Sequence, residues 1–380
     1  MNMKNNRRSR IASRRKLPLA ILQTTSLVAL AMFANSAMAV CTPNQGTVVR
    51  TMPLIGANLT VGRDVPLGTI VFKQAFRNST GYGMRCDPGT YTLNRIRTLP
   101  VTPLAVSGWT GGNLAGKVYE SGVPGIGVYL FSEGQPIPDT STFGNCGGGG
   151  AFCDSSPQLG FDVFFIKIGD VSPGTIQGVQ LPTLQNDYVS PDSTTTMQLV
   201  DISGSINIVS RTCDTPDVDV PMGSYPIFDF KGIGSATSWK ELDIALSNCP
   251  AFYGVYPGNI GSPIFDSEGA QIDNGRAQNV LSFRLDPTDG VIDASAGVIA
   301  LRPSAAGDDP EATGVGIQIA FGHVNPVPLE LSVLQSSGIT PTQVDGASYT
   351  IPLSARYIQT LSDVTAGPAN GSVVFTINYQ

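Results

Sequence analysis

Six cysteines are the residues whose chemistry is most clearly marked in this sequence. No neighbouring pair has the two-residue spacer of common zinc sites, and His323 is the only histidine, so we expect no metal site. An even number of cysteines is typical of disulfides in exported proteins. Their order alone does not fix the connectivity, but the spacing favours the pairs Cys41–Cys86, Cys146–Cys153 and Cys213–Cys249.

Groups that could catalyse a reaction are sparse. A nucleophile mechanism needs a base close to the nucleophile, and His323 has no Gly-x-Ser-x-Gly partner motif in the chain. Two carboxylates could hydrolyse a glycosidic bond without histidine, but nothing marks such a pair. The glycine-rich residues 144–153 lack the Lys-Ser/Thr and the helix start of a phosphate-binding loop. We therefore expect no enzymatic activity and no cofactor.

Two further features have both a binding and a structural interpretation. Trp109 lies between glycines and is either an exposed stacking platform or part of a core, where tryptophan is usually found. Asp214, Asp217 and Asp219 recur along the chain at a spacing that superficially suggests calcium ligands. They lack the glycine turn and the distal glutamate of a helix–loop–helix calcium site, so a solvated linker is the favoured interpretation.

Residues 1–39 have the three zones of a secretory signal peptide. A basic start precedes an apolar stretch over residues 17–33, and small residues end the segment at Ala37-Met38-Ala39. The apolar stretch is interrupted by polar residues, whereas a membrane span needs about 20 predominantly apolar residues. We expect cleavage before Val40 and export of the mature chain.

Charge argues against nucleic acid as a partner. The chain has 23 Lys and Arg and 29 Asp and Glu; removing the seven basic residues of the leader leaves 16, a formal net charge of −13. Phosphate binding needs clustered Lys and Arg.

The many Gly and Pro residues and the few charged ones are typical of short strands and frequent turns.

The alternation of apolar residues predicts two β-sandwich domains, over residues 40–210 and 211–380. In the first, residues 161–166 are apolar on both parities, as in a strand buried between two layers. Ile202, Ile206 and Ile208 share one parity and predict a half-buried strand that closes this domain. The second domain alternates over residues 242–246, 315–321 and 373–379. A polar, Pro-containing stretch over residues 210–216 separates the two.

The second domain resembles the pilin domain of chaperone–usher fimbrial proteins. The resemblance rests on Cys213 followed by Asp219-Val220-Pro221-Met222-Gly223, on Gly232-Ile233-Gly234, and on the strand that ends Ser247-Asn248-Cys249. It also rests on Ile351-Pro352-Leu353-Ser354-Ala355-Arg356-Tyr357 and on the ending with a penultimate tyrosine, Val373-Val374-Phe375-Thr376-Ile377-Asn378-Tyr379. It covers about 170 residues. A stretch from Tyr119 to Val128 is also similar to one in type 3 fimbrial adhesins.

This resemblance implies an immunoglobulin-like domain that lacks its last strand. The groove left beside the final strand would be filled first by a periplasmic chaperone and then, at the outer-membrane usher, by the N-terminal extension of an adjacent subunit. Strand addition of this kind combines backbone hydrogen bonds with alternate side-chain pockets. The resemblance assigns Val373, Phe375, Ile377, Tyr379 and the carboxylate of Gln380 to this assembly surface.

The resemblance also implies a role. Only Val40 precedes Cys41 after cleavage, so no segment is free to be donated, and a subunit that only accepts a strand ends the fibre. The first domain is therefore expected to be a lectin-like tip adhesin for a host glycan or matrix protein. The alternative is a structural or fibre-initiating subunit without an external ligand.

The mannose-binding branch of the family holds sugar with its N-terminal residue and with Asn-Asp after the second cysteine. Here these positions are Val40 and Asp87-Pro88, and only one carboxylate remains. Asp87 in an Asp-Pro-Gly sequence is more often a turn residue. Asp87 and Trp109 are the candidate ligand-binding residues.

Overall fold

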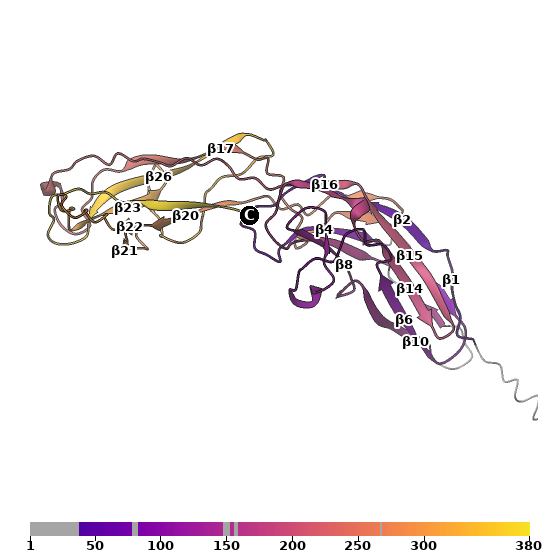
Figure 1. The fold of residues 1–380 in the computed structure, drawn as a ribbon. Helices are drawn as coiled ribbons and strands as arrows, with labels where there is room; N and C mark the ends of the chain where they lie inside the picture. The colour runs from indigo at the N-terminus through magenta and orange to yellow at the C-terminus, as the bar shows by residue number, and fades with distance from the viewer. Residues whose placement is uncertain (1–37, 78–82, 147–152, 156–158, 267) are drawn as a thin grey trace, which may run out of the picture.

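The computed structural model describes residues 38–77, 83–146, 153–155, 159–266 and 268–380. The predicted leader therefore lies outside the described residues, apart from Met38 and Ala39. In the part of the chain that is described, no helix is long and apolar enough to cross a membrane. The described chain forms two elongated β-bodies joined end to end (Figure 1).

The first body is a sandwich of two large sheets. One has the order β10 (Asp139–Cys146), β6 (Tyr91–Thr98), β14 (Leu184–Ser190), β15 (Ser193–Ser203), β2 (Val48–Pro53). The other has the order β19 (Gln271–Ile272), β18 (Ile264–Asp266), β4 (Ile70–Arg77), β12 (Phe161–Lys167), β8 (Ile126–Ser132), β7 (Tyr119–Glu120), with β9 (Gln135–Pro136) beside β8.

Two small sheets and two short 3-10 helices complete the first body. One sheet joins β1 (Cys41–Pro43), β5 (Met84–Cys86) and β11 (Cys153–Ser155), and the other joins β13 (Gly174–Gln177), β16 (Ser205–Val209) and β3 (Asn58–Thr60). The helices are η1 (Gly112–Leu114) and η2 (Gly178–Gln180). The predicted closing strand is thus divided at Gly204, whose φ of 73° lets the chain turn from β15 into a different sheet.

The second body also has two facing sheets. One has the order β17 (Lys240–Cys249), β26 (Ala347–Gln359), β23 (Val315–Phe321), β22 (Val298–Ile299), β21 (Val291–Asp293), with β24 (Val327–Pro328) beside β23. The other has the order β25 (Gln335–Ser336), β20 (Leu281–Pro287), β27 (Val373–Tyr379), and the 3-10 helix η3 (Ile227–Asp229) precedes β17. The predicted all-β architecture of two sandwiches is confirmed.

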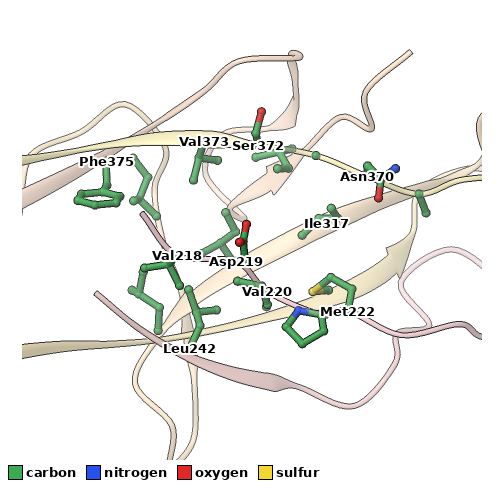
Figure 2. A pocket seen from close by; sticks show the side chains of 18 of the residues that line it. Val218, Asp219, Val220, Met222, Leu242, Ile317, Asn370, Ser372, Val373 and Phe375 are labelled. Atoms are coloured by element: carbon green, nitrogen blue, oxygen red, sulfur yellow. The ribbon is translucent and has the colours of Figure 1, made fainter. Parts of the chain in front are cut away.

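Apolar side chains from both sheets fill the second body. Its buried members include Ile244, Leu285, Ile317 and Leu353. Each comes from the inward parity of its strand, because successive side chains in a strand point to opposite faces. The core is open along one side, between β27 and the segment that leads from Cys213 to η3 (Figure 2).

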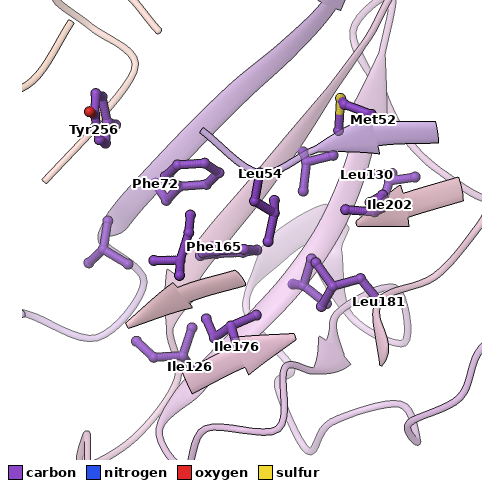
Figure 3. Packing of buried hydrophobic residues seen from close by; sticks show 14 of the residues in the cluster. Met52, Leu54, Phe72, Ile126, Leu130, Phe165, Ile176, Leu181, Ile202 and Tyr256 are labelled. Carbon is purple, nitrogen blue, oxygen red and sulfur yellow. The ribbon is translucent and has the colours of Figure 1, made fainter. Parts of the chain in front are cut away.

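The core of the first body lies between its two large sheets. Phe72 and Phe165 stack there with ring centroids 4.7 Å apart. The strand β12 is buried on both faces, as its sequence predicts, since Phe164 and Ile166 belong to a second apolar cluster on the outer face. Tyr256, which is 0% exposed, reaches this core from much later in the sequence (Figure 3).

Tyr256 belongs to a segment, residues 251–280, that leaves the second body, packs on the first and returns. We call it the crossing segment. Within it, β18 pairs in parallel with β4, which places Phe265 beside Phe76 in the first core. The single boundary near residue 211 is therefore incomplete as a description of the fold, because the first body also contains strands from beyond it.

Arg276 fastens the crossing segment to the first body. Its guanidinium donates hydrogen bonds to the carbonyl oxygens of Gly56 at 2.8 Å and Asn58 at 3.2 Å in the first body. A further bond, to the Tyr253 carbonyl oxygen at 2.6 Å, lies within the crossing segment. It also lies over the Tyr256 ring, 4.5 Å from the centroid. Hydrogen bonds from a charged group contribute about 1.5–3 kcal/mol each, so this side chain is a principal contact of the joint.

Replacing Arg276 should therefore loosen the crossing segment. We expect Arg276→Ala to raise the rate of chymotrypsin cleavage within residues 251–280 by about 30-fold, as a loss of about 2 kcal/mol would. Arg284→Ala is the matched control, because Arg284 is 46% exposed and pairs with Asp286 on its own strand. Equal cleavage rates for Arg276→Ala and the unsubstituted chain would contradict this role.

Candidate functional site

A groove of about 680 Å³ runs along the open side of the second body. Its floor consists of apolar side chains from both sheets, among them Ile244, Leu285 and Ile317. Figure 2 shows Val373 and Phe375 on one side of this groove and Val218, Asp219 and Val220 on the other. The site is thus a long apolar trough with one strand as its rim.

The rim strand β27 has a free edge. It pairs with β20 in antiparallel register from Leu281↔Tyr379 to Pro287↔Val373, and within the described residues no strand pairs with its other side. On that side the Tyr379 N–H donates to the Asp64 carboxylate at 3.3 Å, where the two bodies meet. Along the rest of that side the described residues supply no strand partner, and such an edge is a template for another strand. Val373, Phe375 and Ile377 alternate toward the core with Val374 and Thr376 facing out.

The opposite bank is formed by an extended segment that is not itself a strand. Cys213 fixes its start through the disulfide to Cys249, and Asp214 forms an isolated bridge with Ser247 of β17. The stretch from Thr215 to Pro226 then has no regular secondary structure. Asp217 and Asp219, considered above as calcium ligands, belong to this bank of the groove. The described residues contain no cluster of three groups that could hold a metal ion.

The groove continues toward the end of the second body that is remote from the first. A further hollow of about 410 Å³ is lined by Tyr225, Ile227, Phe230 and residues 364–370. It shares Gly223, Tyr357, Ala369 and Asn370 with the first hollow. The two hollows therefore form one continuous groove that extends to this remote end.

The other end of the groove is closed where the two bodies meet. Tyr379 is 5% exposed, stacks on Phe252 and accepts a hydrogen bond of 3.1 Å from the backbone N–H of Cys213. Burial raises the pKa of the Tyr379 hydroxyl. The backbone of the first body touches it directly, since a Cβ on Gly62 would lie 1.8 Å from the Tyr379 carbonyl oxygen.

The five residues assigned to the assembly surface are therefore divided. Val373 and Phe375 line the groove, whereas Ile377 packs on the second core next to it. Tyr379 lies at the closed end. Gln380 exchanges backbone hydrogen bonds of 3.1 and 2.7 Å with Val280 of the crossing segment.

The two disulfides whose atoms are described join the pairs that the spacing favours. Cys41–Cys86 lies in a small apolar cluster at the end of the first body, and Cys213–Cys249 lies in the second core. Cys146 is also disulfide-bonded. The side chain of Cys153, its predicted partner, lies outside the described residues.

The residues predicted to bind a ligand lie in different clusters. The backbone N–H of Asp87 donates to the Val40 carbonyl oxygen at 2.9 Å, so these two family positions are neighbours. The Asp87 carbonyl oxygen accepts a hydrogen bond of 2.6 Å from the Tyr91 hydroxyl. Trp109 instead covers Gly68 and packs, half-buried, on the outer apolar cluster that contains Phe164. The structure therefore does not bring Asp87 and Trp109 together.

A buried polar layer inside the first body was not predicted. Arg95, 4% exposed, pairs with Glu133, and Arg97, 2% exposed, donates to Asp139 at 2.7 and 2.6 Å. Burial raises the pKa of the neighbouring Tyr188 to about 12. The signal in the sequence is the pair of arginines on the same parity as Leu93, which puts two charges on the inward face of β6.

Comparison with known proteins relates part of this chain to a protein family. Residues 200–380 match the family model described as "Fimbrial protein". A fimbria adhesin protein of Klebsiella pneumoniae is 24% identical over 360 residues, which cover 92% of this chain and 97% of that protein. A type-1 fimbrial protein subunit of Serratia marcescens is 28% identical over 170 residues, 44% of this chain and 78% of that protein.

Among solved structures, the receptor binding domain of the plasmid-born adhesin MrkD1P of Klebsiella pneumoniae is similar to part of this chain. The alignment covers 46% of this chain and 98% of that domain, with 21% identity and a TM-score of 0.31.

The fold and the groove define a two-bodied all-β subunit with an unpaired strand at the edge of its C-terminal sandwich. Residues 200–380 belong to the fimbrial protein family, and the resemblance to chaperone–usher fimbrial adhesins is confirmed. Over almost its whole length the chain is similar to a fimbria adhesin protein.

Proposed function

We propose that this chain is a fimbrial tip adhesin that is completed by a strand from the adjacent subunit. The observation that carries the proposal is the free edge of β27 beside a continuous apolar groove. An extended segment laid along β27 would pair with its free N–H and C=O groups. Alternate side chains of that segment would cover Leu285, Ile317 and their neighbours on the floor.

The assembly partners follow from the same groove. Before incorporation, an apolar trough of this length would expose the core to water and promote aggregation. A periplasmic chaperone would cover it first, and exchange at the outer-membrane usher would replace the chaperone with the extension of the neighbouring subunit.

The position at the fibre tip is supported by how the chain begins its fold. The Val40 carbonyl oxygen accepts a hydrogen bond of 2.9 Å from the Asp87 N–H, and the backbone N–H of Cys41 donates to the Ser193 hydroxyl at 3.0 Å. The Cys41–Cys86 disulfide fixes the same stretch in β1. Residues 40–43 are thus part of the first body and are not available as a donated strand.

The first body would then present the receptor site to a host glycan or matrix protein. Binding is expected to be noncovalent, with no enzymatic step. Asp87 and Trp109 remain the candidate contact residues, on separate surfaces. A structural or fibre-initiating subunit without an external ligand is the alternative function.

Supplying the missing strand should stabilise the protein. We expect the mature chain, beginning at Val40, to aggregate alone and to become a soluble monomer when a donor peptide follows Gln380 through a flexible linker. The measurement is the monomer fraction by size-exclusion chromatography. The control peptide has its apolar residues shifted by one position, which turns them away from the groove. Equal monomer fractions in all three forms would refute the missing strand.

Receptor binding should be tested on the whole complemented chain, because Tyr256 and Phe265 complete the first core and a fragment of residues 40–210 lacks them. We expect binding to at least one glycan or matrix protein on an array. Asp87→Ala or Trp109→Ala should weaken it about tenfold, the effect of losing about 1.4 kcal/mol. Asp201→Ala, at an exposed position on β15, is the control. No binding to any glycan, matrix protein or host cell would favour the structural alternative.

A further inference from the structure

Four exposed apolar side chains belong to chain segments at one end of the second body. Phe228 is 75% exposed, Ile233 is 70% exposed, Leu361 is 60% exposed and Ile227 is 50% exposed. Gln359 joins these segments: its backbone carbonyl accepts from Gly234, its side-chain oxygen accepts from Gly232, and its side-chain amide donates to the Leu361 carbonyl. We call Ile227, Phe228, Ile233 and Leu361 the end patch.

The end patch lies at the end of the second body that is remote from the first. The strand β26 begins beside Cys249, close to the crossing segment, and reaches Gln359 after 13 residues. At about 3.3 Å per residue, this strand spans about 40 Å. The C-terminus, in contrast, lies where the two bodies meet (Figure 1).

The end patch is continuous with the groove. Ile227 lines the outer hollow of the groove together with Tyr225 and Phe230. The exposed faces of Phe228 and Ile233 extend this apolar surface beyond the groove itself. Large side chains exposed to this extent in one short segment are typical of a surface that is covered in an assembly.

The geometry of the groove decides which molecule can cover the end patch. The first body closes the other end, where Gly62 touches the Tyr379 carbonyl and Gln380 is bonded to Val280. A strand that fills the groove and continues into a folded subunit must therefore leave through the remote end. That subunit then lies directly against the end patch.

We propose that the end patch is a docking surface for the folded body of the subunit that donates the strand. The inference rests on the proposed function, because it requires a donated strand in the groove. It adds a second contact, made by the globular part of the donor, which fixes the angle between consecutive subunits. A peptide that carries only the extension lacks this contact.

The test compares two probes that share the same donor strand. One is a purified fimbrial subunit of the same strain, and the other is a synthetic peptide with only the N-terminal extension of that subunit. The rate at which each dissociates from the mature chain is measured for the unsubstituted protein and for Phe228→Ser. We expect Phe228→Ser to accelerate dissociation of the whole subunit about tenfold and to leave the rate for the peptide unchanged.

Two further variants make the result specific. Ile233→Ser, at a position where the native side chain already faces water, should act in the same direction as Phe228→Ser. Val344→Ser removes an apolar side chain of similar exposure, 61%, near Cys249 at the opposite end, and should change neither rate.

The outcomes distinguish a failure of the docking surface from a failure of the proposed strand acceptance. If neither probe binds the unsubstituted chain, the proposed strand acceptance is wrong. If both bind and the end-patch variants release the subunit at the unsubstituted rate, the docking surface is wrong. The docking surface is also wrong if the variants accelerate dissociation of the subunit and of the peptide by the same factor. It is wrong as well if the variants weaken only binding of the chaperone or the usher, or if they abolish self-association of this chain.

Discussion

The free edge of β27 is the constraint on which the rest of this structure depends. A strand whose amide and carbonyl groups face away from its sheet needs a partner, and the core behind Val373 and Phe375 needs a cover. Neither is supplied by the described residues. The second sandwich is therefore built as one part of a joint, and the fimbrial family to which it belongs is consistent with this architecture.

The contacts between the two bodies determine which end of the groove beside β27 is closed. The crossing segment carries Tyr256 into the first core and brings Asn279 to the end of β27, where its side-chain amide donates to the carbonyl oxygens of Thr60 and Gln380. One amide thus bonds both the first body and the last residue. Because this end is fixed and closed, a load applied through a strand in the groove would pass into the first body through several contacts in addition to the linker near residue 211.

The sequence predicts the features that depend on local alternation. The period of two in Val373, Phe375 and Ile377 and the two apolar faces of β12 are properties of short segments, and they appear in the structure as expected. The crossing segment could not be predicted in this way, because β18 contributes only three residues to a parallel pairing with a distant strand. The inward Arg95 and Arg97 were missed since charged residues are assigned to the surface until their partners are known. A binding site composed of loops from distant parts of a chain is harder still to predict from local sequence.

Amide hydrogen exchange along β27, measured residue by residue, tests the central claim most directly. In the dilute mature chain without a donor, amides that face the free edge should exchange rapidly while those bonded to β20 are protected. Adding a donor peptide should slow exchange of the edge amides by roughly 100-fold, as new backbone hydrogen bonds form. Edge amides that are already protected without the peptide, or that exchange equally fast with it, would contradict the account.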